Sequence, residues 1–153
     1  MKRCLQCKGE RLSEATTEER LEVAGKTFEA SVPVIRCADC GESYYPGPEL
    51  ERFELEVAGA LAEHGEISAE AFRFMRKALG VRACELAELL DVAQETVSRW
   101  EHGRLPIERR AAALLSAMVL DRLEGRTATL DRLKALLKPE PLPSLVRVVP
   151  RSA

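Results

Sequence analysis

Residues 83–102 read ACELAELLDVAQETVSRWEH, and they predict two short helices around a tight connection. Apolar residues recur at the spacing of helix faces that pack on one another, namely Leu86, Leu90, Val97 and Trp100. Ala87 is small where the two helices would cross, and Val92 can fill the corner between them. Asp91 lies in the turn, where its side chain tolerates a left-handed backbone. The pattern therefore predicts a helix pair that is buried on one side.

The opposite face of the second helix, predicted over residues 94–102, carries short or fork-shaped polar groups. These are Gln94, Glu95, Ser98 and Arg99. In the DNA major groove an arginine can bind guanine through two hydrogen bonds, and a glutamine can bind adenine in the same way. A helix pair of this kind places its second helix in that groove. We therefore predict that these four residues contact bases, and that the flanking Arg82 and Arg104 contact phosphates.

Helices predicted on both sides extend this unit into an all-helical domain of about five helices. Ser68 caps the first of them, and Gly80 ends it. The predicted helices cover residues 68–79, 83–90, 94–102, 107–123 and about 130–137. The tail that follows is rich in proline, and no structure is predicted for it.

The helix predicted over residues 107–123 has an apolar stripe that is too wide for burial against one neighbour. The stripe consists of Ile107, Ala111, Leu114, Leu115, Met118 and Val119. A symmetric homodimer would bury the remainder and place two recognition helices about 34 Å apart, one turn of DNA. The alternative is that this stripe belongs to the core of a single chain.

Upstream of this domain the sequence predicts a connecting helix and, before it, a β-hairpin. Leu50, Phe53, Val57 and Leu61 recur at helical spacing within residues 48–66. Two runs with β-branched and apolar residues, 21–24 and 27–35, flank a predicted turn at Gly25-Lys26.

Two C-x-x-C pairs frame the hairpin: Cys4 with Cys7, and Cys37 with Cys40. Gly9 and Gly41 follow the pairs, and they free the backbone to point amide groups at the sulfurs. Four thiolates form a closed tetrahedral shell that suits one structural Zn²⁺ per chain, with no open position for a substrate. The same ligands bind iron, and a single C-x-x-C can be a redox pair, so both remain alternatives. Cys84 stands alone on a helix and is interpreted as a packing residue.

These elements predict a small α+β zinc domain, rich in β-hairpin and built on four cysteines, followed by the helical domain. The predicted boundaries are 1–47 for the zinc-binding domain, 48–66 for the connecting helix, 67–138 for the helix-turn-helix domain and 139–153 for the tail. No apolar run is long enough to cross a membrane, and the N-terminus lacks a signal-peptide core. We therefore expect a cytoplasmic protein that does not associate with membranes. The net charge of the 153 residues is only −2, so attraction to DNA must come from the local distribution of charge.

Through the pattern LAELLDVAQETVSRWEHG, residues 86–103, the chain resembles the lambda-repressor-like helix-turn-helix regulators. Asp91 departs from the glycine that this family usually has in the turn. The order of the two modules over about residues 1–124 resembles the MqsA-type antitoxins, whose zinc portion is called a YgiT-type finger.

That resemblance implies an antitoxin whose zinc domain blocks a small mRNA-cleaving toxin. It also implies a homodimer that represses its own operon by binding a double-stranded operator. Arg99 matches a base-contacting arginine of the family, whereas Glu95 stands where the family has an asparagine. The alternative is a stand-alone transcriptional regulator with no cognate toxin. We expect no catalytic site, because four cysteines saturate one ion and neither histidine lies near a nucleophile motif.

Overall fold

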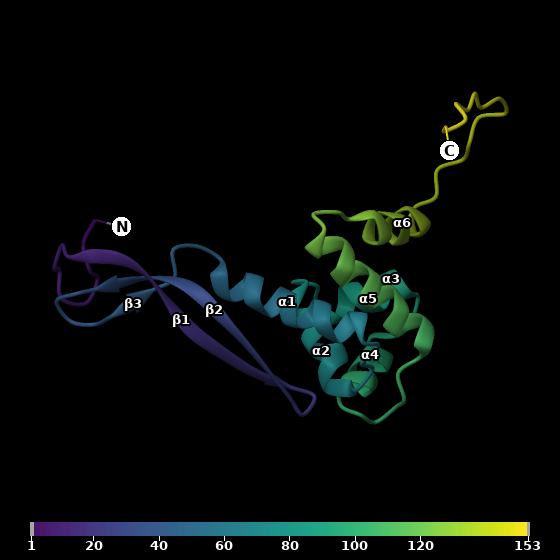
Figure 1. Cartoon of the computed structure of the whole chain (residues 1–153). Helices are drawn as coiled ribbons and strands as arrows, with labels where there is room; N and C mark the ends of the chain where they lie inside the picture. Colours follow the sequence, from purple (N-terminus) through teal and green to yellow (C-terminus); the bar gives the residue numbers. More distant parts are fainter. Residues whose placement is uncertain (1, 153) are drawn as a thin grey trace.

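In the computed structural model, which describes residues 2–152, a small antiparallel sheet is followed by helices (Figure 1). The sheet has the order β1-β2-β3, with β1 at Leu12–Val23, β2 at Lys26–Cys37 and β3 at Ser43–Tyr44. The helices are α1 (Glu49–Glu63), α2 (Ala69–Ala78), α3 (Ala83–Leu90), α4 (Gln94–Glu101), α5 (Arg109–Leu123) and α6 (Ala128–Leu137). This order confirms the predicted fold class, a strand-rich unit that carries the cysteine pairs and then a helical unit.

The hairpin of β1 and β2 is longer than predicted, and its turn lies one residue earlier. Ala24 and Gly25 form the turn with φ of 52° and 70°, and Val23 pairs with Lys26. A two-residue turn of this kind needs positive φ at both central positions, which glycine adopts without strain. Each strand has 12 residues, so the hairpin extends well beyond the predicted runs. The first nine residues of β1 were missed because their sequence, LSEATTEER, is mostly polar.

The helices begin and end within a few residues of the predicted positions. Helix α3 has the predicted bounds, and the Ser68 hydroxyl accepts a hydrogen bond from the Ala71 amide at 3.3 Å, which confirms the cap of α2. Asp91 ends α3 with φ 54° and ψ 48°, the left-handed conformation expected of it. Helix α5 begins at Arg109, two residues after the predicted start at Ile107.

Helix α1 is part of the helical core as well as a connector. It packs against α2 and α5, and its buried residues Val57 and Leu61 belong to the main apolar cluster. Gly59 faces α5 so closely that an added Cβ would lie 2.2 Å from Leu123 Cδ1. The turn end of the hairpin reaches the same cluster through Val23, which is 3% exposed. The sheet and the helices are therefore joined by α1 and by shared apolar contacts.

The predicted dimer interface on α5 is wrong for four of its six residues. Ala111, Leu115, Met118 and Val119 are at most 4% exposed and lie in the core of the chain itself. The stripe is wide because α5 packs against three helices, α1, α2 and α6. Only two members of the predicted interface, Ile107 and Leu114, remain partly exposed.

A buried ion pair ties α2 to the C-terminal end of α4. The Arg76 and Glu101 side chains are 10% and 6% exposed. Arg76 Nε donates to one carboxylate oxygen of Glu101, and Nη2 donates to the other at 3.0 Å. Arg76 Nη1 also donates to the Val81 carbonyl at 2.8 Å, in the loop before α3. This one guanidinium therefore links three segments of the helical unit.

After α6 the described chain has no regular structure, and it extends away from the helices (Figure 1). This part agrees with the prediction for the proline-rich tail. Among residues 2–152, no helix combines the length and the apolar character that a bilayer crossing requires.

Candidate metal centre and nucleic-acid interface

The structure brings the four predicted metal ligands together. The Sγ atoms of Cys4, Cys7, Cys37 and Cys40 all lie within 4.8 Å of one another. Cys4 Sγ lies 3.6 Å from Cys40 Sγ, and Cys7 Sγ lies 3.6 Å from Cys37 Sγ. A tetrahedral shell with metal–sulfur distances of about 2.3 Å separates its sulfurs by roughly 3.8 Å. The cluster therefore has the size and the donor set to hold a metal ion.

The two C-x-x-C turns have the same backbone conformation. The Lys8 amide donates to the Cys4 carbonyl at 3.0 Å, and the Gly41 amide donates to the Cys37 carbonyl at 2.9 Å. Lys8 and Gly41 also adopt equivalent left-handed conformations, with φ of 64° and 78°. Two equivalent turns that face one another present their thiols to a common centre. This symmetry is the local reason that the four sulfurs converge.

The Gly9 amide donates to Cys7 Sγ at 3.4 Å, as predicted, and Gly9 also has a second role that was not predicted. The left-handed residue of the first turn is Lys8, so Gly9 is not needed there for its backbone freedom. The second role is steric, because a Cβ at Gly9 would lie 2.1 Å from Asp39 Oδ2 and 3.2 Å from Asp39 Cβ. Asp39 lies between the second pair of cysteines, and Arg11 Nε donates to its Oδ1 at 2.6 Å. Gly9 therefore allows the two turns to approach each other.

Replacing Gly9 with alanine is expected to push Asp39 away and separate the two cysteine turns. Overpacking of this kind costs about 1–3 kcal/mol. The metal-loaded protein should therefore unfold at lower temperature and lose its metal to a competing chelator more readily. Gly47→Ala is the matched control, because an added Cβ there meets only Glu49 Oε1 at 3.6 Å. Equal chelator resistance of the two variants would contradict this role of Gly9.

Tyr44 is a neighbour of the cluster that the sequence analysis did not identify. Its hydroxyl lies 3.1 Å from Cys4 Sγ and accepts a hydrogen bond from the Gln6 amide at 3.2 Å. The signal available in the sequence was an aromatic residue shortly after the second cysteine pair. In the metal-free cluster the backbone amide of Cys7, followed by the Tyr44 hydroxyl, lowers the pKa of Cys4 to about 6.

Cys40 holds its proton much more tightly than Cys4 does. The Glu42 amide by itself would lower the pKa of Cys40, but desolvation and the neighbouring cysteine sulfurs outweigh it and raise this pKa to about 12. A metal that binds as a tetrathiolate must therefore displace protons near neutral pH. Metal affinity should rise as the pH rises, because fewer protons then compete for the sulfurs.

The helix-turn-helix pair leaves its predicted base-contacting face open to solvent. Leu86, Val97 and Trp100 are at most 1% exposed, and they anchor α3 and α4 in the helical core. The remaining side of α4 exposes all four predicted residues: Gln94, Glu95, Ser98 and Arg99. Their placement on one exposed side of a buried helix is compatible with contacts to bases.

The two predicted phosphate contacts differ in their surroundings. Arg82 is exposed, but its guanidinium donates to Glu85 Oε1 at 3.2 Å. Arg104 is exposed just beyond α4, and within residues 2–152 it makes no ion pair. Arg104 is therefore the more available cation beside α4.

Cys84 lies on α3, apart from the four-cysteine cluster, as predicted. Its side chain is exposed, however, so it does not pack in the core. It lies near the N-terminal end of α3, whose buried residues are Leu86 and Ala87. It provides a thiol outside the cluster for control experiments.

Comparison with protein-family models found no match, and comparison with curated proteins found no relative of this chain.

Proposed function

We propose that this protein is a zinc-containing transcriptional repressor that binds double-stranded DNA through α4. The observation that carries the proposal is the combination of a buried helix pair with an exposed polar face on its second helix. Arg99 lies on that face and Arg104 follows it, and both side chains are exposed. Within the described chain, neither Arg99 nor Arg104 forms an ion pair. Such groups can exchange water for guanine and phosphate at little desolvation cost to the protein.

Arg99→Ala is expected to weaken binding to an operator by about 1–3 kcal/mol and to relax the base preference at one position. The operator is first selected from random-sequence DNA with the unaltered chain. Affinity is then measured at one fixed salt concentration, because phosphate contacts make it salt-dependent. The fluorescence of Trp100, the single tryptophan, checks that the helical core is intact.

Arg52→Ala provides the matched control for Arg99→Ala. Arg52 is exposed on α1, which packs mainly against α2 and α5. This variant should bind the selected operator with nearly unchanged affinity. Equal binding by the Arg99 and Arg52 variants would show that α4 does not enter the groove through this face.

A homodimer is part of the proposal, because two recognition helices one DNA turn apart bind a palindromic operator. After the correction of the α5 interface, Ile107 and Leu114 are the partly exposed apolar residues that remain for dimer contact. Light scattering of the metal-loaded protein measures the oligomeric state directly. A monomer that binds a single half-site would remove the dimer from the proposal.

We further propose that the N-terminal sheet binds a small basic toxin protein, so that the repressor acts as the antitoxin of a toxin–antitoxin pair. The open edge of β1 supports this, since within residues 2–152 this 12-residue strand lies at the edge of the sheet and pairs with β2 alone. Exposed carboxylates at Glu14, Glu18 and Glu22 make this strand acidic. An exposed strand edge is a surface on which another chain can add hydrogen bonds.

Purification from native extract distinguishes the antitoxin from the stand-alone regulator. Antitoxin function predicts a stoichiometric small basic partner encoded next to this chain, and its expression alone should arrest growth. Charge reversal at Glu14 and Glu18 should release that partner but leave DNA binding unchanged. A homogeneous preparation without a partner, and without a neighbouring toxin gene, would favour the stand-alone regulator.

A further inference from the structure

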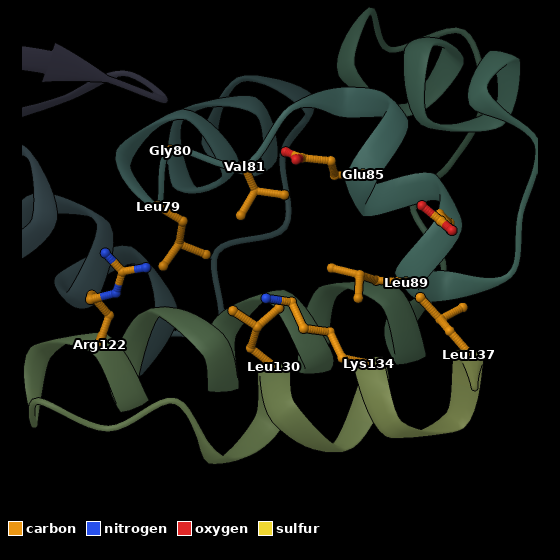
Figure 2. Close-up of a pocket in the computed structure, with 10 residues that line it drawn as sticks. Leu79, Gly80, Val81, Glu85, Leu89, Arg122, Leu130, Lys134 and Leu137 are labelled. Atoms are coloured by element: carbon orange, nitrogen blue, oxygen red, sulfur yellow. The ribbon is translucent and has the colours of Figure 1, made fainter. Parts of the chain in front are cut away.

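A cavity of about 330 Å³ lies between α6 and α3, the first helix of the helix-turn-helix pair (Figure 2). Its apolar wall is formed by Leu79, Val81, Leu89, Leu130 and Leu137. This volume lies at the lower end of the range of small-molecule sites, about 300–1,000 Å³.

The cavity exists because α6 lies loosely on the helices beneath it. Within the described chain α6 has no fully buried residue, and it contacts α3 and α5 through the half-buried Leu130 and Leu133. Val81 and Leu89 on the opposite wall are likewise only half-buried. Apolar surface is therefore left in contact with water, and a bound apolar group would cover it favourably.

The charges around the cavity favour an anion. Arg122 on α5 and Lys134 on α6 line it, and neither makes an ion pair within residues 2–152. Figure 2 shows the Lys134 ammonium reaching over Leu130 toward the middle of the cavity, with Arg122 at the end beside Leu79.

Two carboxylates of α3, Glu85 and Glu88, also line the cavity, and they differ in whether a cation already neutralises them. Glu85 Oε2 accepts from the Arg82 amide at 2.8 Å, and Glu85 Oε1 accepts from the Arg82 guanidinium at 3.2 Å. The charge of Glu85 is therefore balanced mainly by Arg82, and Lys134 adds a weaker attraction. Glu88 is exposed to solvent at the rim. The two free cations thus outnumber the one free carboxylate at the cavity.

We propose that this cavity binds a small amphipathic organic anion. The apolar body of the ligand lies against the leucine and valine wall, and its carboxylate accepts hydrogen bonds from Lys134 and Arg122. Charge-assisted hydrogen bonds of this kind are stronger than neutral ones. The ligand bridges α6 and α3, so it stabilises the folded chain as its concentration rises. This inference goes beyond DNA binding and requires no DNA for its test.

The test compares octanoate with octylammonium, which share an apolar chain and carry opposite charges. Each is titrated into the full-length, metal-loaded protein, and the leucine and valine methyl groups are followed by NMR. Octanoate is expected to shift the methyl signals of Leu89 and Leu130 and to bind at least about tenfold more tightly than octylammonium. Equal affinities, or shifts spread over the whole surface, would overturn the proposal.

Two variants locate the site on the molecule. Lys134→Gln should weaken octanoate binding about tenfold, whereas Arg132→Gln, an exposed position of α6 that does not line the cavity, should not. Leu89→Trp fills the cavity and should abolish binding, provided that its NMR spectrum remains that of a folded chain. If Lys134→Gln and Arg132→Gln bind octanoate equally, the proposal is wrong, whatever the outcome of the filled variant.

Discussion

Removal of the metal is expected to unfold the N-terminal sheet and leave the helical unit folded. A zinc ion held by four thiolates contributes about 10–16 kcal/mol of apparent binding energy near neutral pH, and in a small domain this energy is also folding energy. Cys37→Ser removes a buried ligand at the end of β2, so it should act like a strong chelator. Metal content, together with amide exchange of residues 12–44, measures the effect.

The single tryptophan makes the two halves separately observable. Trp100 is 1% exposed and packs edge-on against Phe72, with their ring centroids 5.7 Å apart. Its fluorescence should therefore be unchanged when Cys37→Ser releases the metal. Cys84→Ser, at the exposed thiol outside the cluster, is the matched control and should retain both metal and sheet. Cooperative loss of the tryptophan signal with the metal would contradict the independence of the two units.

Glu101→Ala is expected to destabilise the helical unit by about 3–5 kcal/mol. Loss of one partner leaves the Arg76 guanidinium buried without its counter-charge, and that penalty exceeds the ordinary value of a salt bridge. Because the Arg76 guanidinium also donates a hydrogen bond to the Val81 carbonyl, both α4 and the loop before α3 should become more mobile. Urea unfolding of the metal-loaded protein, followed by Trp100 fluorescence, measures the change.

Two comparisons separate this effect from simple loss of a charge. Glu124→Ala removes a partner of Arg126 in a surface pair of the helical unit whose side chains are each 59% exposed, and it should cost about 0–1 kcal/mol. A double variant, Arg76→Met with Glu101→Leu, removes both charges and should restore most of the stability. If Glu101→Ala cost no more than Glu124→Ala, the Arg76–Glu101 pair would have no special role in positioning α4.

The correct sequence predictions are those that depend on neighbouring residues. The bounds of α3, the Ser68 cap and the left-handed Asp91 follow from helix periodicity and from the backbone preferences of single residues. The paired cysteines likewise belong to two short turns, each of which is specified by its own few residues. Residues close along the chain limit one another's conformations through steric contacts and local hydrogen bonds.

The wrong predictions concern pairs of segments that are distant along the chain. The apolar stripe on α5 correctly indicated that this face is buried. Periodicity cannot show whether the face is buried by a second copy of the chain or, as in the structure, by α1 and α2 of the same chain. The second role of Gly9, which was not predicted, depends on Asp39 from the other cysteine turn. The length of the hairpin was missed because half-buried and exposed polar residues alternate along β1 without an apolar signal.

The sequence by itself therefore determined the helices, the turn between α3 and α4, and the identity of the four thiol ligands. Only the tertiary structure decided that α5 is buried within the chain, that Arg76 is paired with Glu101, and that Tyr44 approaches Cys4. The physical reason is that side-chain spacing along one helix or turn specifies which face is apolar or polar. The partner that covers that face depends on how all the elements pack together.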